Sequence, residues 1–200
     1  MLAAKKFVTY GKDDKIPPRE RLLAVAADLF YRQGIRAVGV ESIADAAGTN
    51  KMTLYRHFSS KDELVAEYLR RLAENAKASF AALEAKYPGQ PRAQLAAWLR
   101  AVADHCGDVK ERGCALMNAA VELPESDHPA RRVIEEYKTA QRNWLIRQCE
   151  AAGLAEPEML ADELFLLIEG ARVTAQSLGR DGLGARLIRM GEAMIASHES

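Results

Sequence analysis

The segment from Ile43 to Phe58 constrains the fold of this chain more than any other segment. Its first half carries apolar residues at helical spacing and stops at Gly48, and its second half begins after Asn50. Glycine directly after a helix and asparagine directly before one are common helix boundaries, because glycine accepts a left-handed backbone and asparagine caps free amide groups. The segment therefore predicts two short helices joined by a tight turn, the second of them rich in polar and cationic side chains.

A further helix is predicted on each side of this pair. The first follows Pro17 and Pro18, which suit a helix start, and ends at Gly34. The helix after the pair is predicted at about residues 61–86, with Ser59 or Ser60 as its N-cap. Three short helices, the last two joined by a tight turn, match helix-turn-helix architecture.

The remaining sequence predicts five more helices, at about residues 92–105, 113–122, 129–152, 157–178 and 183–197. No segment alternates apolar and polar residues convincingly, as a half-buried strand would. The predicted fold class is therefore all-α, with an N-terminal three-helix helix-turn-helix domain and a larger helical domain. We place a flexible basic arm at residues 1–16, the helix-turn-helix domain at 17–65 and the larger domain at 66–200.

The charge of the chain is unevenly distributed, although its formal net charge over 200 residues is zero. Up to Ala66 there are 11 basic and 8 acidic residues, a balance of +3, and the remainder carries −3. A mildly basic head on an acidic body is expected when only the head meets DNA.

The three cysteines, Cys106, Cys114 and Cys149, are widely spaced and form no Cys-x-x-Cys pattern. They predict neither a disulfide framework nor a structural zinc site, and they favour a reducing environment. No apolar run is long enough to cross a bilayer, and the first 15 residues lack the apolar core of a secretory signal. We therefore expect a cytoplasmic protein with no membrane contact, no metal and no cofactor.

Over about a quarter of its length, near the N-terminus, the chain resembles the tetracycline-repressor (TetR) family of bacterial transcription regulators. The resemblance covers residues 17–65 and rests on motifs in the family's order and spacing: Leu29-Phe30, Gly34, Ile43-Ala44, Ala47-Gly48, Lys51, Thr53-Leu54-Tyr55-Arg56-His57-Phe58 and Lys61-Asp62-Glu63-Leu64. It implies a homodimer that binds a palindromic double-stranded DNA operator. It also implies that an unidentified small-molecule effector binds the larger domain and releases the DNA.

The second helix of the pair has the side chains that a helix in the DNA major groove needs. Such a helix presents polar groups to bases and phosphates and apolar groups to its own domain. Lys51, Thr53 and Arg56 are the expected outward set, and Leu54 and Phe58 are expected to face the core.

The resemblance adds further DNA contacts. Tyr55 and His57 match the family's pair that donates hydrogen bonds to backbone phosphates, although an isolated tyrosine could equally pack on the first helix. Lys61 is expected to grip another phosphate, together with the amides that open the next helix. Thr49 and Asn50 are expected to touch bases or backbone from the turn.

The larger domain supplies candidates for pairing and for effector binding. The resemblance implies an intersubunit four-helix bundle built from the last two helices, and a monomeric core is the alternative. The dimer-interface candidates are Leu164, Ile168, Ala171, Ala175, Leu187, Met190 and Met194. The effector-site candidates, each of which could instead be ordinary core, are Trp98, Val102, His105, Met117, Asn118, Val121, Glu122, Tyr137 and Trp144.

These features together predict a ligand-responsive DNA-binding repressor that is not an enzyme, because no nucleophile–base arrangement or phosphate-cradling glycine loop is visible. The alternative is a small-molecule or thiol-redox sensor whose head has lost DNA binding. Glu41 would repel a phosphate, and Met52 stands where the family often has a small residue. Arg112 near Cys114 could favour a thiolate.

Overall fold

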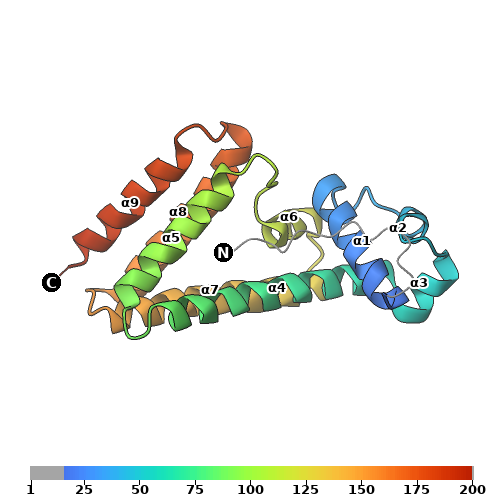
Figure 1. Ribbon diagram of the computed structural model, residues 1–200, viewed down its shortest axis with the longest axis horizontal. Helices are drawn as coiled ribbons and strands as arrows, with labels where there is room; N and C mark the ends of the chain where they lie inside the picture. Colours follow the sequence, from blue (N-terminus) through green and yellow to red (C-terminus); the bar gives the residue numbers. More distant parts are fainter. Residues whose placement is uncertain (1–15, 200) are drawn as a thin grey trace. The chain divides into compact units, whose positions relative to one another are not determined.

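The computed structural model describes residues 16–199, and every regular element in that range is an α-helix (Figure 1). The helices are α1 (Pro18–Gln33), α2 (Val40–Ala46), α3 (Lys51–His57), α4 (Lys61–Lys86), α5 (Pro91–Gly107), α6 (Ala115–Glu122), α7 (Pro129–Ala151), α8 (Pro157–Ser177) and α9 (Leu183–Ser197). The predicted all-α class, with an N-terminal helix-turn-helix domain and a larger helical domain, is confirmed. The predicted arm lies outside the described residues except for Ile16.

The predicted helix boundaries differ from the observed ones by two residues or fewer. The clearest difference is at α6, which begins at Ala115 and not at Gly113. Gly113 has a φ of 80°, which lies outside the right-handed helical region, so the helix cannot start there. α5 extends past its predicted end at His105 to Gly107.

The described residues form two compact units, each with its own interior. The first unit contains residues 16–74 and Cys114–Glu135, and the second contains Asn75–Gly113 and residues 136–199. Both α4 and α7 therefore run from one unit into the other. The bounds of these two units differ from the predicted domain ranges 17–65 and 66–200. Those domain ranges stay a prediction.

The first three helices enclose a small apolar interior. α1, α2 and α3 each contact the other two, and Leu22, Ile43 and Leu54 are completely buried between them. Phe58 is 2% exposed, and the ring of Phe30 lies 5.8 Å from that of Tyr68 on α4. Burying one such side chain contributes about 1.5–3 kcal/mol, so this interior stabilises the packing of α3 against α1 and α2.

Two side-chain caps set the start of α3 and of α4. The Oδ1 atom of Asn50 accepts a hydrogen bond from the backbone N–H of Thr53 at 2.9 Å, as expected of an N-cap. Of the two serines considered for α4, Ser60 is the cap, because its Oγ accepts from the N–H of Glu63 at 3.0 Å. The caps place α3 and α4 one after the other with only three residues between them.

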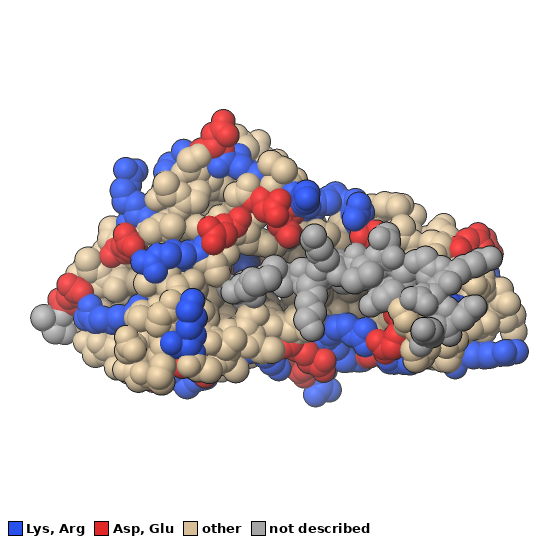
Figure 2. All heavy atoms as spheres, viewed as in Figure 1, with Lys and Arg blue, Asp and Glu red and all other residues tan. Residues whose placement is uncertain are grey.

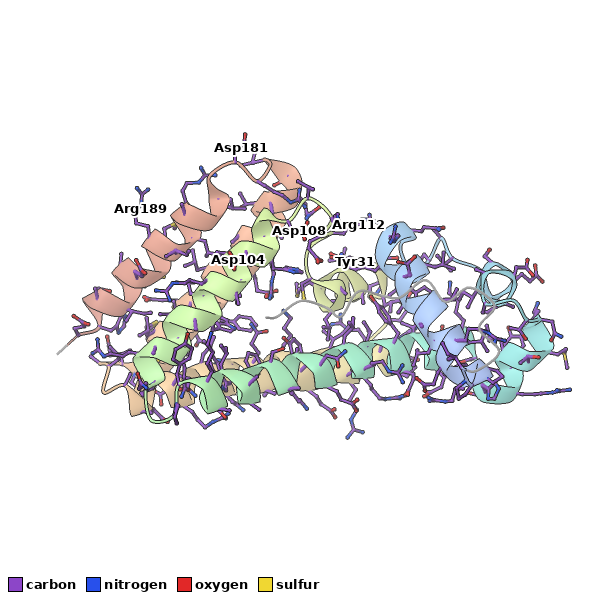
Figure 3. All side chains as sticks on the ribbon, in the orientation of Figure 1. Tyr31, Asp104, Asp108, Arg112, Asp181 and Arg189 are labelled. Atoms are coloured by element: carbon purple, nitrogen blue, oxygen red, sulfur yellow. The ribbon has the colours of Figure 1, made fainter. Side chains whose placement is uncertain are left out.

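In the second unit, α5 lies alongside both α8 and α9, which also contact each other (Figure 1). A Cβ atom at Gly191 would lie 2.5 Å from Cδ2 of Leu99, so glycine is what allows α9 to approach α5 this closely. At the far end of these helices, Arg180 donates to the carbonyl oxygens of Asp108 at 3.1 Å and Glu111 at 2.6 Å. Figure 3 shows Asp108 directly after α5 and Asp181 in the connection between α8 and α9.

An aromatic cluster forms the interior between α4, α5 and α7 of the second unit. Trp98 and Trp144 are each 2% exposed, with ring centroids 6.0 Å apart. Trp144 also stacks on Phe80 at 4.8 Å, and its indole N–H donates to Oε1 of Glu84 at 2.9 Å. The hydrogen bond satisfies the one polar group that burying this tryptophan would otherwise leave unpaired.

Candidate nucleic-acid interface

The exposed face of α3 carries the side chains predicted to meet DNA. Lys51, Arg56 and His57 are exposed, and Tyr55 keeps 41% of its surface. The opposite face is anchored by Leu54, which is fully buried. At this exposure Tyr55 is not part of the core. The face thus presents two cations, a phenol and an imidazole, all of which can donate hydrogen bonds to phosphate or base acceptors.

Three further predicted residues lie at the start of α3. Asn50 is exposed, but its Oδ1 atom serves the cap and also accepts from Oγ1 of Thr53 at 3.2 Å. Thr49 and Thr53 are half-buried. Met52, which the sequence marked as unusual, is 67% exposed on the same face. The first turn of α3 is therefore rigidly held, with an apolar side chain in the middle of its outer surface.

Lys51 is paired with an acidic side chain of α2. Its Nζ atom lies 3.3 Å from Oε1 of Glu41, and the two side chains are 49% and 74% exposed. Glu41 belongs to the first turn of α2, so the pair bridges the two helices of the helix-turn-helix. Oppositely charged side chains are also interspersed across the face drawn in Figure 2.

Lys61, predicted to hold a phosphate, is engaged within the first unit. Its Nζ donates to the carbonyl oxygen of Ile35 at 2.6 Å. Burial lowers the pKa of its ammonium group, and the nearby carboxylates of Asp62 and Glu122 oppose that shift. In this structure the ammonium holds the turn that follows α1.

The same turn is held from the other side by α6. The backbone N–H of Arg36 donates to Oε2 of Glu122 at 3.0 Å, and its Nε donates to the Glu122 carbonyl at 2.6 Å. An ion pair also joins Arg36 to Glu125 at 2.9 Å. A Cβ atom at Gly34, where φ is 93°, would lie 3.1 Å from the Glu122 carboxylate. Glu122, an effector-site candidate, therefore joins α6 to the turn between α1 and α2.

A hollow of about 400 Å³ lies beside this turn in the first unit. His128 lies at its wall, with Nε2 3.4 Å from Oδ1 of Asp62 and Nδ1 accepting from the N–H of Ala130 at 3.1 Å. No group of three metal-ligating side chains occurs among residues 16–199. The wall carries both signs of charge: Ile35, Arg36, Lys61, Asp62, Leu123, Glu125, Asp127, His128 and Pro129.

The effector-site candidates fall into two groups. Those of α6, namely Met117, Asn118, Val121 and Glu122, belong to the first unit, and Val121 is 77% exposed. Those of the second unit are Trp98, Val102, His105, Tyr137 and Trp144, of which all except His105 are buried. Within the second unit, the structure brings together the two tryptophans of the set.

Sequence reasoning missed a charged cluster between α7 and α8. Lys138 and Arg172 both bond Oε1 of Glu169, at 2.8 and 2.5 Å, and all three side chains are about 15% exposed or less. The Nζ of Lys138 also lies 5.5 Å from the ring of Phe165. Glu169 and Arg172, three residues apart beside the apolar stripe of α8, were the available signal.

Most of the expected dimer-interface residues are covered within the single chain. Ile168, Leu187 and Leu164 are 0–1% exposed, because α5 packs over this side of α8 and α9. Ala171 and Ala175 are buried as well, and only Met190 and Met194 keep appreciable exposure. Elsewhere on α8, Leu166 is 70% exposed.

The two buried cysteines lack the environment of a reactive thiolate. Burial raises the pKa of the Cys106 thiol, although Arg172 and Arg180 pull it the other way. Burial also raises the pKa of Cys149, to about 11. Both thiols are therefore protonated at neutral pH, which disfavours oxidation at these two positions.

Comparison with known proteins supports the resemblance at the N-terminus. Residues 22–68 match the family described as bacterial regulatory proteins, tetR family, a range that holds all of α2 and α3. The HTH-type transcriptional repressor KstR2 of Rhodococcus jostii (strain RHA1) is 48% identical over 62 residues. That match covers 31% of this chain and spans 29% of the length of the relative.

Two solved structures match nearly the whole chain. SCO4454, a TetR-family transcriptional regulator from Streptomyces coelicolor, has a TM-score of 0.86 and 27% identity over 92% of this chain and 96% of its own. The putative TetR transcriptional regulator sav143 from Streptomyces avermitilis has a TM-score of 0.77, with 32% identity over 92% of this chain and 98% of its own. The chain belongs to the TetR family.

Membership of the TetR family makes this chain a transcriptional regulator with a helix-turn-helix DNA-binding domain, as the resemblance implied. The TetR family model includes the exposed residues of α3 and also Lys61. Over the range that the structure describes, this TetR-family chain has no helix with the length and apolar character that spanning a membrane requires.

Proposed function

We propose that this TetR-family chain is a ligand-responsive repressor that binds a palindromic operator in the cytoplasm as a homodimer. The observation that carries the proposal is the outer face of α3, where Lys51, Tyr55, Arg56 and His57 present hydrogen-bond donors on a capped and anchored helix. Donors at this spacing suit the phosphate oxygens and base edges of the major groove. Repression is also the role named for the Rhodococcus jostii relative.

We assign the DNA contacts by their chemistry. Tyr55 and His57 hold backbone phosphates and set the register of α3 on the duplex. Lys51 and Arg56 reach base edges, while Thr49, Asn50 and Thr53 line the start of the helix. Two copies of α3 are needed, because one short helix contacts too few bases to be selective.

We propose a dimer face on the outer side of α8, with a contribution from α9. Leu166 and Val173 lie two helical turns apart on α8 and are 70% and 65% exposed. Leu178 follows at 86%, and Met190 on α9 is 49% exposed. A row of exposed apolar side chains on two neighbouring helices is what an intersubunit four-helix bundle would cover.

The effector is proposed to act by shifting a conformational equilibrium. Binding in the larger domain would favour a state in which α4 moves and the two copies of α3 leave the major-groove spacing of about 34–36 Å or its multiples. The aromatic interior around Trp98 and Trp144 is the proposed neighbourhood of that site. Equal α3 separations in free, operator-bound and effector-bound crystals would contradict this mechanism.

Selection of bound fragments from the source genome tests the DNA-binding proposal. We expect an enriched palindrome that binds two chains, with affinity falling steeply between about 50 and 200 mM salt. Tyr55→Phe should weaken binding to every duplex, because it removes one phosphate donor. Tyr87→Phe, which deletes a hydroxyl in the loop after α4, is the matched control and should bind normally. Failure to bind any duplex at low salt would defeat the proposal.

A further inference from the structure

We propose that Glu41 and Lys51 act together as a reader of one G·C base pair in each half-site. The inference rests on the proposed function, since it requires that α3 enter the major groove. It goes further by assigning a base preference to a carboxylate that would otherwise only oppose DNA binding.

The pair places one hydrogen-bond donor, the Lys51 ammonium, beside one acceptor, the Glu41 carboxylate. Lys51 is the first residue of α3 and Glu41 lies in the first turn of α2, so the two charges come from both helices of the motif. Their Nζ and Oε1 atoms are 3.3 Å apart. Both side chains are well exposed, at 49% and 74%, so their polar ends remain accessible from solvent.

A G·C pair offers the complementary groups at nearly the same separation. In the major groove, guanine O6 accepts a hydrogen bond and cytosine N4 donates one with the hydrogen that base pairing leaves free. These two atoms are hydrogen-bonded to each other, so they are about 2.9 Å apart. Lys51 can donate to O6 while Glu41 accepts from N4, and the ion pair need not break.

The charge balance of the motif is consistent with such a role for Glu41. Between Val40 and His57, Glu41 and Asp45 balance the cations Lys51 and Arg56, so the helix-turn-helix segment itself has no net charge. A carboxylate beside phosphates lowers the affinity for every duplex. A hydrogen bond from a cytosine amino group to Glu41 would offset that loss at G·C pairs and not at A·T pairs, so the carboxylate would discriminate between them.

A purely structural role for Glu41 predicts a different result. An acidic residue in the first turn of a helix stabilises that helix through its dipole, and an exposed ion pair adds little. Removing the charge would then reduce binding to all sequences by the same small factor. It would leave the preferred sequence unchanged at every position.

Selection from a randomised duplex library, carried out in parallel on the full-length chain and its variants, tests the proposal. With Glu41→Gln we expect the consensus to persist except at one symmetric G·C position. There the preference for G·C over A·T should fall at least about fivefold, because the glutamine amide is an uncharged acceptor and, unlike the carboxylate, can also pair with adenine N6 and N7. Affinity for a random-sequence 30-base-pair duplex should rise, because one carboxylate has been removed from the DNA-facing surface.

Two further variants make the outcome decisive. Lys51→Gln should relax the same position as Glu41→Gln, since both groups read one base pair. Asp45→Asn removes the same charge from α2 one turn later and should raise random-duplex affinity without changing the consensus. Circular dichroism melting of each variant checks that the fold is retained.

Three results would overturn the inference: an unchanged consensus in Glu41→Gln, the same change in Asp45→Asn, or different positions relaxed by Glu41→Gln and Lys51→Gln. Failure of the proposed function looks different, because the unmodified chain would then enrich no sequence at all.

Discussion

The ammonium group of Lys61 holds the turn between α1 and α2, where the family resemblance implied a phosphate contact. Its 2.6 Å bond to the Ile35 carbonyl and its lowered pKa both reflect partial burial. Because its ammonium is bonded to the Ile35 carbonyl, Lys61 contributes directly to the stability of the first unit and only indirectly to DNA affinity.

For Lys61→Ala we therefore expect a loss of stability of about 1 kcal/mol, the net contribution of one typical hydrogen bond. The salt dependence of duplex binding should keep its slope, because no phosphate contact is removed. Thermal unfolding and a salt titration measure the two effects. A slope reduced by about 0.9, with unchanged stability, would instead restore the phosphate role.

Glu67 provides a pH-dependent test at the same scale. Its carboxylate accepts from Arg19 and Arg70, each at 2.8 Å, and the Arg19 bond is the main reason that its pKa lies below the usual 4.5. A carboxyl whose folded pKa is depressed stabilises the fold above its unfolded pKa and loses that contribution as the pH falls through the folded value.

We expect Glu67→Gln to unfold with about 1 kcal/mol less free energy than the unmodified chain at pH 7. The difference should shrink as the pH drops below about 4.5. Urea unfolding at several pH values measures it. A difference that stays constant down to pH 2 would mean that the ion pair is not its source.

At the scale of elements, α3 is too short to be stable alone and depends on its cap and its anchors. Isolated helices of fewer than about 12 residues are marginal in water, and α3 spans Lys51–His57. The bond from the Thr53 N–H to Asn50 therefore matters more here than in a long helix.

Asn50→Ala should cost about 1 kcal/mol and raise the amide exchange rates of α3 before those of α1. Asn50→Ser, which keeps a capping oxygen, should restore most of the protection. Hydrogen-exchange mass spectrometry resolves the two helices. Equal protection in Asn50→Ala and the unmodified chain would show that tertiary packing alone holds α3.

The helices of this chain were predictable from local signals, whereas several side-chain roles were not. Prolines and glycines at helix ends, and the cap at Asn50, are encoded within a few residues of the boundary they set. Glu122 bonds to Arg36, which lies 86 residues away along the chain. No local sequence pattern therefore predicts that Glu122 joins α6 to the turn after α1.

The burial of Ile168 was also only partly predictable from the sequence. An apolar stripe on α8 predicts that the stripe is covered, but periodicity does not say whether α5 or a second chain covers it. In the structure α5 covers this stripe, and Leu166 and Val173 remain exposed. The exposure of the α3 side chains that we propose for DNA contact was predictable, because these residues lie within one continuous motif.

At the scale of the whole molecule, the proposed dimer face can be tested by charge. Leu166→Glu with Val173→Glu should convert the dimer to a monomer at micromolar concentration, because burying two carboxylates in an apolar contact is costly. Val109→Glu, at a position 81% exposed in the loop after α5, is the control and should remain dimeric. Analytical ultracentrifugation measures the oligomeric state of each variant. A double variant that stays dimeric would show that the interface lies elsewhere.

The first compact unit is discontinuous along the chain, since it takes in Cys114–Glu135 as well as the N-terminal helices. Leu116, Ala119 and Leu123 from that later stretch are buried, and Glu122 and Glu125 hold Arg36. A gene fragment that ended after α4 would encode α3, but it would lack Cys114–Glu135, the stretch that completes the first unit. We therefore expect a fragment that ends after α4 to unfold more easily than the same helices in the full chain, because the stretch that completes their unit is synthesised only after α5.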